Sequence, residues 1–85
     1  MENIIAVFSN RNQAMQFASV LKRIGIRTKT INTPRDLSVS CGISIVFENK
    51  HLGQARIVVE RLGLYSSVRM YLVSGDLFKK YLLIR

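Results

Sequence analysis

The chain alternates between short apolar runs and segments in which apolar residues recur at helical spacing. The first run, 4–8, is wholly apolar, which is typical of a central strand covered on both faces. Ser9 or Asn10 can then cap a helix, and Gln13 stands at capping-box distance from Asn10. Gly25 marks its end, so the pattern predicts a helix over 10–24 with the stripe Ala14, Phe17, Ala18 and Leu21.

The second half of the chain repeats this order. β-Branched residues predict a second strand over 26–31, and Ile43, Ile45 and Phe47 share one face of a third strand over 43–48. Asn49 can cap a second helix, which ends at Gly63-Leu64 as the first ends at Gly25-Ile26. The apolar stripe of this second helix is Leu52, Ala55, Val58, Val59 and Leu62. A fourth strand is predicted over 68–73.

The order βαββαβ predicts an α+β fold, the ferredoxin-like sandwich with a four-stranded antiparallel sheet and two helices on one face. We expect this domain over 1–73 and a C-terminal amphipathic extension over 74–85. The extension is either a third helix that begins at Ser74 or a fifth edge strand over 80–85. Its many apolar residues lead us to expect that it covers part of the open sheet face, or packs against a second subunit.

Length and composition narrow the class of protein. Eighty-five residues, 48% hydrophobic and 21% charged, describe one folded domain. The apolar runs are too short to span a bilayer and no basic segment precedes one at the start, so we expect a cytoplasmic protein without membrane insertion. One cysteine and one histidine exclude an intramolecular disulfide and argue against a His/Cys metal site. We expect neither a metal nor a cofactor.

The formal net charge of +8 is high for this length and favours a polyanionic partner. The basic residues are scattered in runs of at most two, as on a solvated surface. A nucleic-acid-binding sheet face is an alternative, but the third strand lacks the aromatic-rich pattern of RNA-binding sheets. Tyr71 is the one aromatic residue that we place on that face with assurance. We therefore do not favour nucleic acid as the partner.

The single cysteine, Cys41, lies in the longest segment without a helix or strand pattern, 33–42. The predicted topology brings the start of the third strand beside the end of the first, so Cys41 is expected near Ser9 and Asn10. Free N–H groups at a helix N-terminus favour a thiolate, and Arg35, with Arg11, can add positive charge. The alternative is a cysteine that acts merely as a small apolar residue.

This loop carries a resemblance to a known family. The elements Pro34-Arg35, Leu37-Ser38 and Ser40-Cys41-Gly42, followed by an apolar strand, resemble the small bacterial selenium/sulfur (Se/S) carrier protein-like family, over 4–73. The resemblance implies that Cys41 accepts sulfur or selenium as a persulfide or selenosulfide and passes it to a partner protein. It also implies that Gly42 permits close approach of that partner and that Arg35 stabilises the anionic adduct, within a loop that includes Ser38 and Ser40.

We therefore expect a non-enzymatic sulfur or selenium carrier, or thiol relay, that acts through Cys41. An enzyme is the least expected class, because no acid/base pair is evident and His51 is predicted at the opposite sheet edge. The alternative is a nucleic-acid-binding or protein-interaction adaptor that uses its basic surface and apolar tail, with a homo-oligomer formed through that tail.

Overall fold

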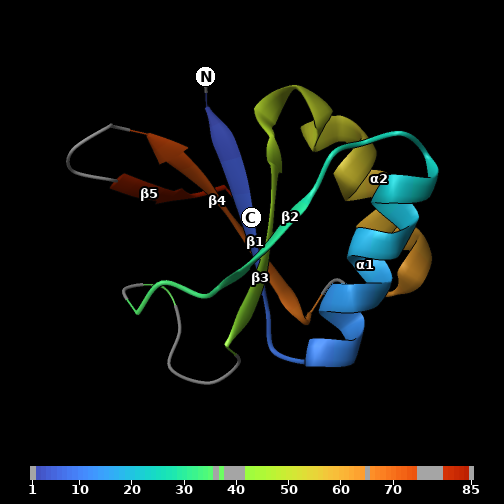
Figure 1. The fold of residues 1–85 in the computed structure, drawn as a ribbon, viewed down its shortest axis with the longest axis horizontal. Coiled ribbons are helices and arrows are strands. Elements are labelled where there is room, and N and C mark those ends of the chain that lie inside the picture. Colours follow the sequence, from blue (N-terminus) through green and yellow to red (C-terminus); the bar gives the residue numbers. More distant parts are fainter. Residues whose placement is uncertain (1, 36, 38–41, 65, 75–79, 85) are drawn as a thin grey trace.

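The chain folds into an antiparallel sheet with two helices on one of its faces (Figure 1). The computed structural model describes residues 2–35, 37, 42–64, 66–74 and 80–84. The elements along the chain are β1 (Asn3–Phe8), α1 (Arg11–Arg23), β2 (Lys29–Asn32), β3 (Ile43–Glu48), the 3₁₀ turn η1 (Asn49–His51), α2 (Leu52–Leu62), β4 (Val68–Ser74) and β5 (Lys80–Leu83).

The sheet has five strands in the order β2-β3-β1-β4-β5, and every neighbouring pair is antiparallel. The α+β class, the two helices on one face and the antiparallel sheet are as the sequence predicts. The count of four strands was wrong, because the C-terminal segment pairs with β4 and adds a fifth strand. β1 lies at the centre, as expected of its apolar run, with its residues from Ile4 to Phe8 buried.

The core lies between the sheet and the helices. Alternate residues of β1, β3 and β4 point into it, and the predicted stripes of both helices meet them. Three aromatic rings form its centre, with Phe17 of α1 in tilted contact with Phe8 (5.2 Å between centroids) and Phe47 (6.1 Å). The apolar face predicted for the third strand, Ile43, Ile45 and Phe47, is the face that packs in this way.

The ends of both helices follow the sequence signals. The Asn10 side chain accepts a hydrogen bond from the N–H of Gln13 (3.2 Å), so Asn10 is the N-cap of α1. Gly25 (φ +89°) and Gly63 (φ +68°) close α1 and α2 in the left-handed conformation, where a residue with a Cβ is strained. The next residues, Ile26 and Leu64, are buried against the core.

Two predicted boundaries were wrong. The second strand begins at Lys29 rather than at residue 26, because the N–H of Ile26 donates to the carbonyl of Leu21 (2.9 Å) and completes the turn that ends α1. Asn49 does not cap α2. It begins the 3₁₀ turn η1, which carries no side-chain cap, and α2 starts at Leu52.

The C-terminal segment forms the edge strand β5, the second of the two predicted alternatives. The N–H of Ile84 donates to the carbonyl of Met70 (3.0 Å), and the Ile84 side chain packs against the core. Leu82 and Leu83 are 62% and 52% exposed. The described part of the tail thus extends the sheet at its edge. The expectation that the tail covers part of the open face, or packs against a second subunit, stays a prediction, because residues 75–79 lie outside the described residues. No helix in the described ranges is long and apolar enough to cross a membrane.

Candidate functional site

The end of β1 and the start of β3 lie side by side, as the predicted topology requires. Val7 pairs with Ser44, so the residues that follow β1 face those that precede β3. An open hollow of about 540 Å³ lies there, between the N-terminus of α1 and the end of β2. We call it the loop hollow. The structure thus brings together three of the predicted site residues, namely Ser9, Asn10 and Gly42. The complete lining of the hollow is Ser9, Asn10, Arg11, Asn32, Gly42 and Ile43.

The other predicted site residues divide into two groups. Cys41, Ser38 and Ser40 lie outside the described residues. Arg35 is exposed in the turn after β2, where the N–H of Leu37 donates to the carbonyl of Pro34 (3.0 Å), and it does not line the loop hollow. Arg11 does line the hollow. Of the two cations that the sequence suggested, Arg11 is therefore the one placed beside Gly42.

The base of the Cys41 loop is tied to β3 by two hydrogen bonds. The N–H of Thr33 donates to the carbonyl of Gly42 (2.9 Å), which continues the pairing of β2 with β3 past Asn32. The hydroxyls of Thr33 and Ser44 form a second bond of 2.6 Å, and Ser44 is fully buried. The two ends of the loop are therefore held together, whatever the path of the chain between them.

Sequence reasoning missed Thr33, Ser44 and Asn32. A signal for Ser44 was present, since it is a polar residue inside an apolar strand and a buried hydroxyl requires a partner. Its partner was not evident because Thr33 lies eleven positions earlier, and only the strand register brings the two together. Asn32 fell between the predicted strand, 26–31, and the predicted loop, 33–42, whereas it is the last residue of β2.

The N-terminus of α1 gives the loop hollow a positive potential. The side-chain oxygen of Asn10 is engaged with the N–H of Gln13, and no acidic residue stands in the first turn. The N–H of Ser9 donates to the carbonyl of Ser67 (3.0 Å), and its hydroxyl donates to the same atom (3.4 Å), which ties this end of β1 to the start of β4. The helix dipole and the Arg11 guanidinium therefore both favour an anion here.

Gly42 is not required by the backbone. Its φ lies outside the left-handed region, and a Cβ at this position would meet nothing within 4 Å. Of the described residues, none would therefore contact a short side chain at position 42, which leaves room for a partner to approach beside Gly42.

Metal ligands and the single histidine bear on what other chemistry this edge could support. Among the described residues, no group of three His, Cys, Asp or Glu side chains could hold a metal ion. His51 belongs to η1, which follows β3 and therefore lies at the far end of the sheet from Gly42, as predicted. The arrangement can hold an anionic group beside the residue that precedes Gly42.

Comparisons with known proteins agree with the resemblance in the loop. Neither the curated proteins nor the solved structures gave a match to this chain. The sequence profile of one family matches residues 3–66, which include β1, both helices, β3 and the whole loop that contains Cys41. By that match, which spans most of its length, this chain belongs to the family described as "Putative Se/S carrier protein-like".

Proposed function

We propose that this protein is a non-enzymatic carrier that holds sulfur or selenium on Cys41 and delivers it to a partner protein. The observation that carries the proposal is the loop hollow next to Gly42, with Arg11 and the N-terminus of α1 on its wall. Cys41 is bonded directly to Gly42, so its backbone begins within one peptide unit of that positive surface. Membership of the Se/S carrier protein-like family supports the same chemistry.

In the proposed transfer, atoms and electrons balance at each step, so no added oxidant is needed. The Cys41 thiolate attacks the terminal sulfur of a donor persulfide, the donor's S–S bond breaks, and the donor leaves as a thiolate while Cys41 gains an S–S bond. A donor selenosulfide reacts at selenium in the same way. The acceptor's thiolate then takes the terminal atom from Cys41. A carrier of this kind needs an accessible thiolate and a docking surface, and it needs no base, metal or cofactor.

The fold suits a module that presents one loop to a partner. We infer that β1 to β4 form a ferredoxin-like unit, because their strand order 2-3-1-4 and the two crossover helices follow the split βαβ arrangement. β5 is an addition to its β4 edge. The loop hollow lies where β1 and β2 end and β3 begins, so both ends of the Cys41 loop rest on rigid strands.

The test is the pH dependence of Cys41 alkylation by iodoacetamide, with the denatured chain as the reference. We expect a midpoint below the value of about 8.5 for a free cysteine, because the helix terminus and Arg11 favour the thiolate. Arg11→Gln should raise the midpoint, and Arg61→Gln on α2 should leave it unchanged. A midpoint at or above that of the denatured chain would show an ordinary packing cysteine and end the proposal.

Transfer itself is measured by mass spectrometry after incubation with a small-molecule persulfide. We expect the folded protein to gain one sulfur atom that a thiol reductant removes, and Cys41→Ser to gain none. Gly42→Ala is the informative variant. It should leave the unfolding midpoint unchanged, because its Cβ meets open space, and it should slow delivery to a protein acceptor if close approach matters.

A further inference from the structure

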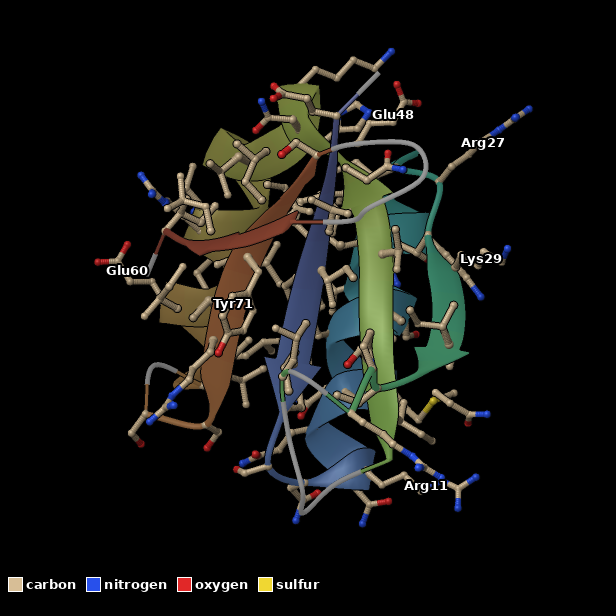
Figure 2. The ribbon with its side chains drawn as sticks, turned by 90° about the vertical axis from the view of Figure 1, so that its left-hand side faces the viewer. Arg11, Arg27, Lys29, Glu48, Glu60 and Tyr71 are labelled. Carbon is tan, nitrogen blue, oxygen red and sulfur yellow. The ribbon has the colours of Figure 1, made fainter. Side chains whose placement is uncertain are left out.

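The basic residues are scattered along this chain, but the acidic residues are not, and one part of the fold carries cations alone. Residues 3–35 contain no acidic residue, and all six of their basic side chains are exposed. These residues build α1, the turn after it and the edge strand β2, which we call the α1–β2 flank. Figure 2 shows Arg11, Lys29 and Arg27 along this side of the molecule, with Glu60 on the opposite side. The six cations are Arg11, Lys22, Arg23, Arg27, Lys29 and Arg35.

The flank has a hollow at each end. The loop hollow lies at its lower end in Figure 2, with Arg11 on its wall. A second hollow of about 350 Å³ lies at the turn between α1 and β2, and we call it the turn hollow. Asn32 in the loop hollow is four positions after Thr28 in the turn hollow, a distance of roughly 13 Å along a strand. The turn hollow is lined by Lys22, Gly25, Ile26, Arg27 and Thr28.

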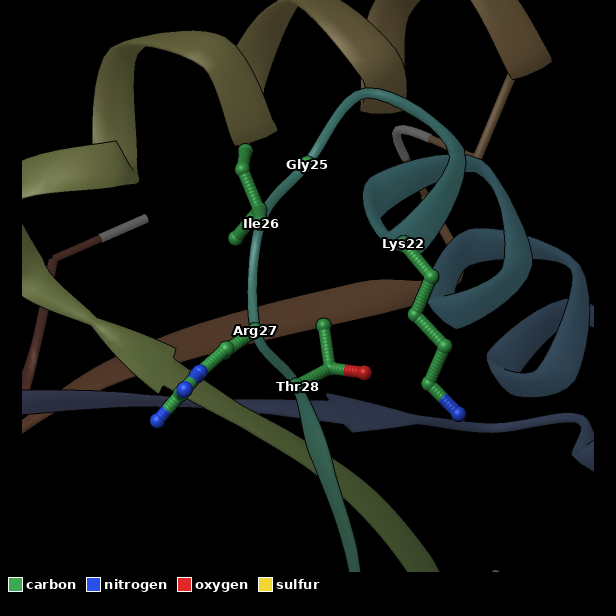
Figure 3. Close-up of a pocket in the computed structure, with 5 residues that line it drawn as sticks. All are labelled: Lys22, Gly25, Ile26, Arg27 and Thr28. Atoms are coloured by element: carbon green, nitrogen blue, oxygen red, sulfur yellow. The ribbon is translucent and has the colours of Figure 1, made fainter.

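The turn hollow contains an unused polar atom. The Thr28 hydroxyl oxygen is buried and has no hydrogen-bond partner. Figure 3 shows this oxygen directed towards the Lys22 side chain, with the Arg27 side chain extending from the other side of the turn. The turn hollow lies at the C-terminal end of α1, where the carbonyls of Val20, Leu21 and Lys22 each accept a backbone N–H group.

The end of α2 shows that this charge is not a requirement of the turn. Gly63 and Leu64 form the same left-handed turn as Gly25 and Ile26, with the same pattern of backbone hydrogen bonds. Where α1 and its turn carry Lys22, Arg23, Arg27 and Lys29, the corresponding positions of the second half are Glu60, Arg61, Tyr65 and Ser67. The same local structure therefore forms with balanced charge, and the cations of the first half need another explanation.

The acidic groups that the structure describes near the flank do not neutralise it, while Asp36, next to Arg35, lies outside the described residues. Glu48, at the end of β3, pairs with Lys50 at 3.8 Å, and Glu60 belongs to α2. Glu2 precedes β1 and is exposed. In the part of the chain that the structure describes, none of the flank's cations makes an ion pair. The flank therefore presents unpaired positive charge along its length, which attracts an extended polyanion.

We propose that the α1–β2 flank binds the phosphate backbone of a nucleic-acid strand. Both hollows are lined by the residue types that contact phosphates: an Arg or Lys together with Ser, Thr or Asn. Their separation suits a ligand whose anionic groups repeat along a chain. The described aromatic side chains lie in the core or, for Tyr71, on β4 away from the flank, so binding is sequence-tolerant and uses the backbone rather than stacked bases.

The experiment measures binding of a labelled, mixed-sequence single-stranded RNA by fluorescence anisotropy at several salt concentrations. We compare the unchanged protein with two double variants, each of which removes two positive charges. The flank variant is Lys22→Gln/Arg27→Gln. The control variant is Arg61→Gln/Arg69→Gln, with one change on α2 and one on the open sheet face. The flank variant should lose about tenfold or more in affinity, and its salt slope should fall by about 1.4, or 0.7 for each lost phosphate contact. The control variant should lose less than about threefold, since its side chains make no phosphate contact.

Three results would overturn the proposal. The first is equal weakening in both variants, which would show a response to net charge alone. The second is the absence of RNA binding at about 50 mM salt, where backbone contacts are strong. The third is displacement of the RNA by poly-glutamate more readily than by unlabelled RNA, which would indicate an acidic protein face as the partner. Cys41→Ser should leave RNA binding unchanged, so this test and that of the carrier function fail independently.

Discussion

At the scale of single residues, the hydroxyl pair of Thr33 and Ser44 helps to hold together the two ends of the segment that contains Cys41. Ser44 is fully buried on the sheet face opposite the helices, where its oxygen has no access to water. A buried hydroxyl that loses its partner costs more than the bond itself contributes, because the desolvated group is left unpaired. Loss of this pair should therefore both destabilise the sheet and loosen the connection between Thr33 and β3.

This coupling predicts a non-additive pair of mutations. Ser44→Ala and Thr33→Val should each lower the free energy of unfolding by about 1 kcal/mol, because each leaves the other hydroxyl unpaired. The double variant should lose less than the sum, since no unpaired hydroxyl remains. Urea unfolding measures all three. Ser19→Ala, at an exposed position of α1, is the matched control and should change stability by less than about 0.5 kcal/mol. Additive losses would show that the two hydroxyls do not depend on each other.

At the scale of elements, β5 changes the boundary between domain and tail. It pairs with β4 along four residues, and Ile84 beyond it contacts the core. The division into a domain over 1–73 and an extension over 74–85 stays a prediction, but the described part of the extension belongs to the same sheet. Leu82 and Leu83 leave an apolar edge exposed there, which a second subunit could cover.

The contribution of β5 can be measured at two neighbouring positions. Ile84→Ala should lower the free energy of unfolding by about 1 kcal/mol, less than for a fully buried residue because Ile84 is only partly buried. Leu83→Ala should change it by less than about 0.5 kcal/mol, since that side chain is more than half exposed. Thermal and urea unfolding give both values. Equal losses at the two positions would mean that Leu83 is covered in solution, as in an oligomer.

At the scale of the whole molecule, the dominant feature is a net charge of +8 on 85 residues, of which residues 3–35, the part of the chain with the α1–β2 flank, carry +6. Unpaired like charges repel one another in the compact state and lower its stability. The proposed carrier function and the flank proposal use this charge differently. In the first, the loop hollow attracts an anionic adduct at one point, and in the second, the flank attracts a nucleic-acid strand along its length.

Self-repulsion predicts that salt stabilises this protein. Raising the ionic strength from about 0.01 M to about 0.15 M shortens the Debye length from roughly 30 to 8 Å and should raise the Tm. Circular dichroism at each salt concentration measures the shift. Arg61→Gln/Arg69→Gln carries two fewer charges and should show a smaller rise. A Tm that stays constant or falls would indicate that the charges are already neutralised by contacts within the fold.

The sequence by itself determined the local elements. The stripe of α1, the Asn10 cap and the glycines that end both helices are short-range patterns, because capping bonds and left-handed turns involve residues a few positions apart. The position of Gly42 beside Ser9 and Asn10 also followed, since element order fixes which strand ends share an edge.

Tertiary structure decided what depends on register and on competition between partners. It moved the start of β2 to Lys29, because Ile26 gains more from the core than from a strand edge. It added β5 to the sheet, because β4 offered an unpaired edge. It paired Thr33 with Ser44 and aligned scattered cations along one flank. Such contacts join residues far apart in the chain, and no local pattern encodes which of several partners each residue will meet.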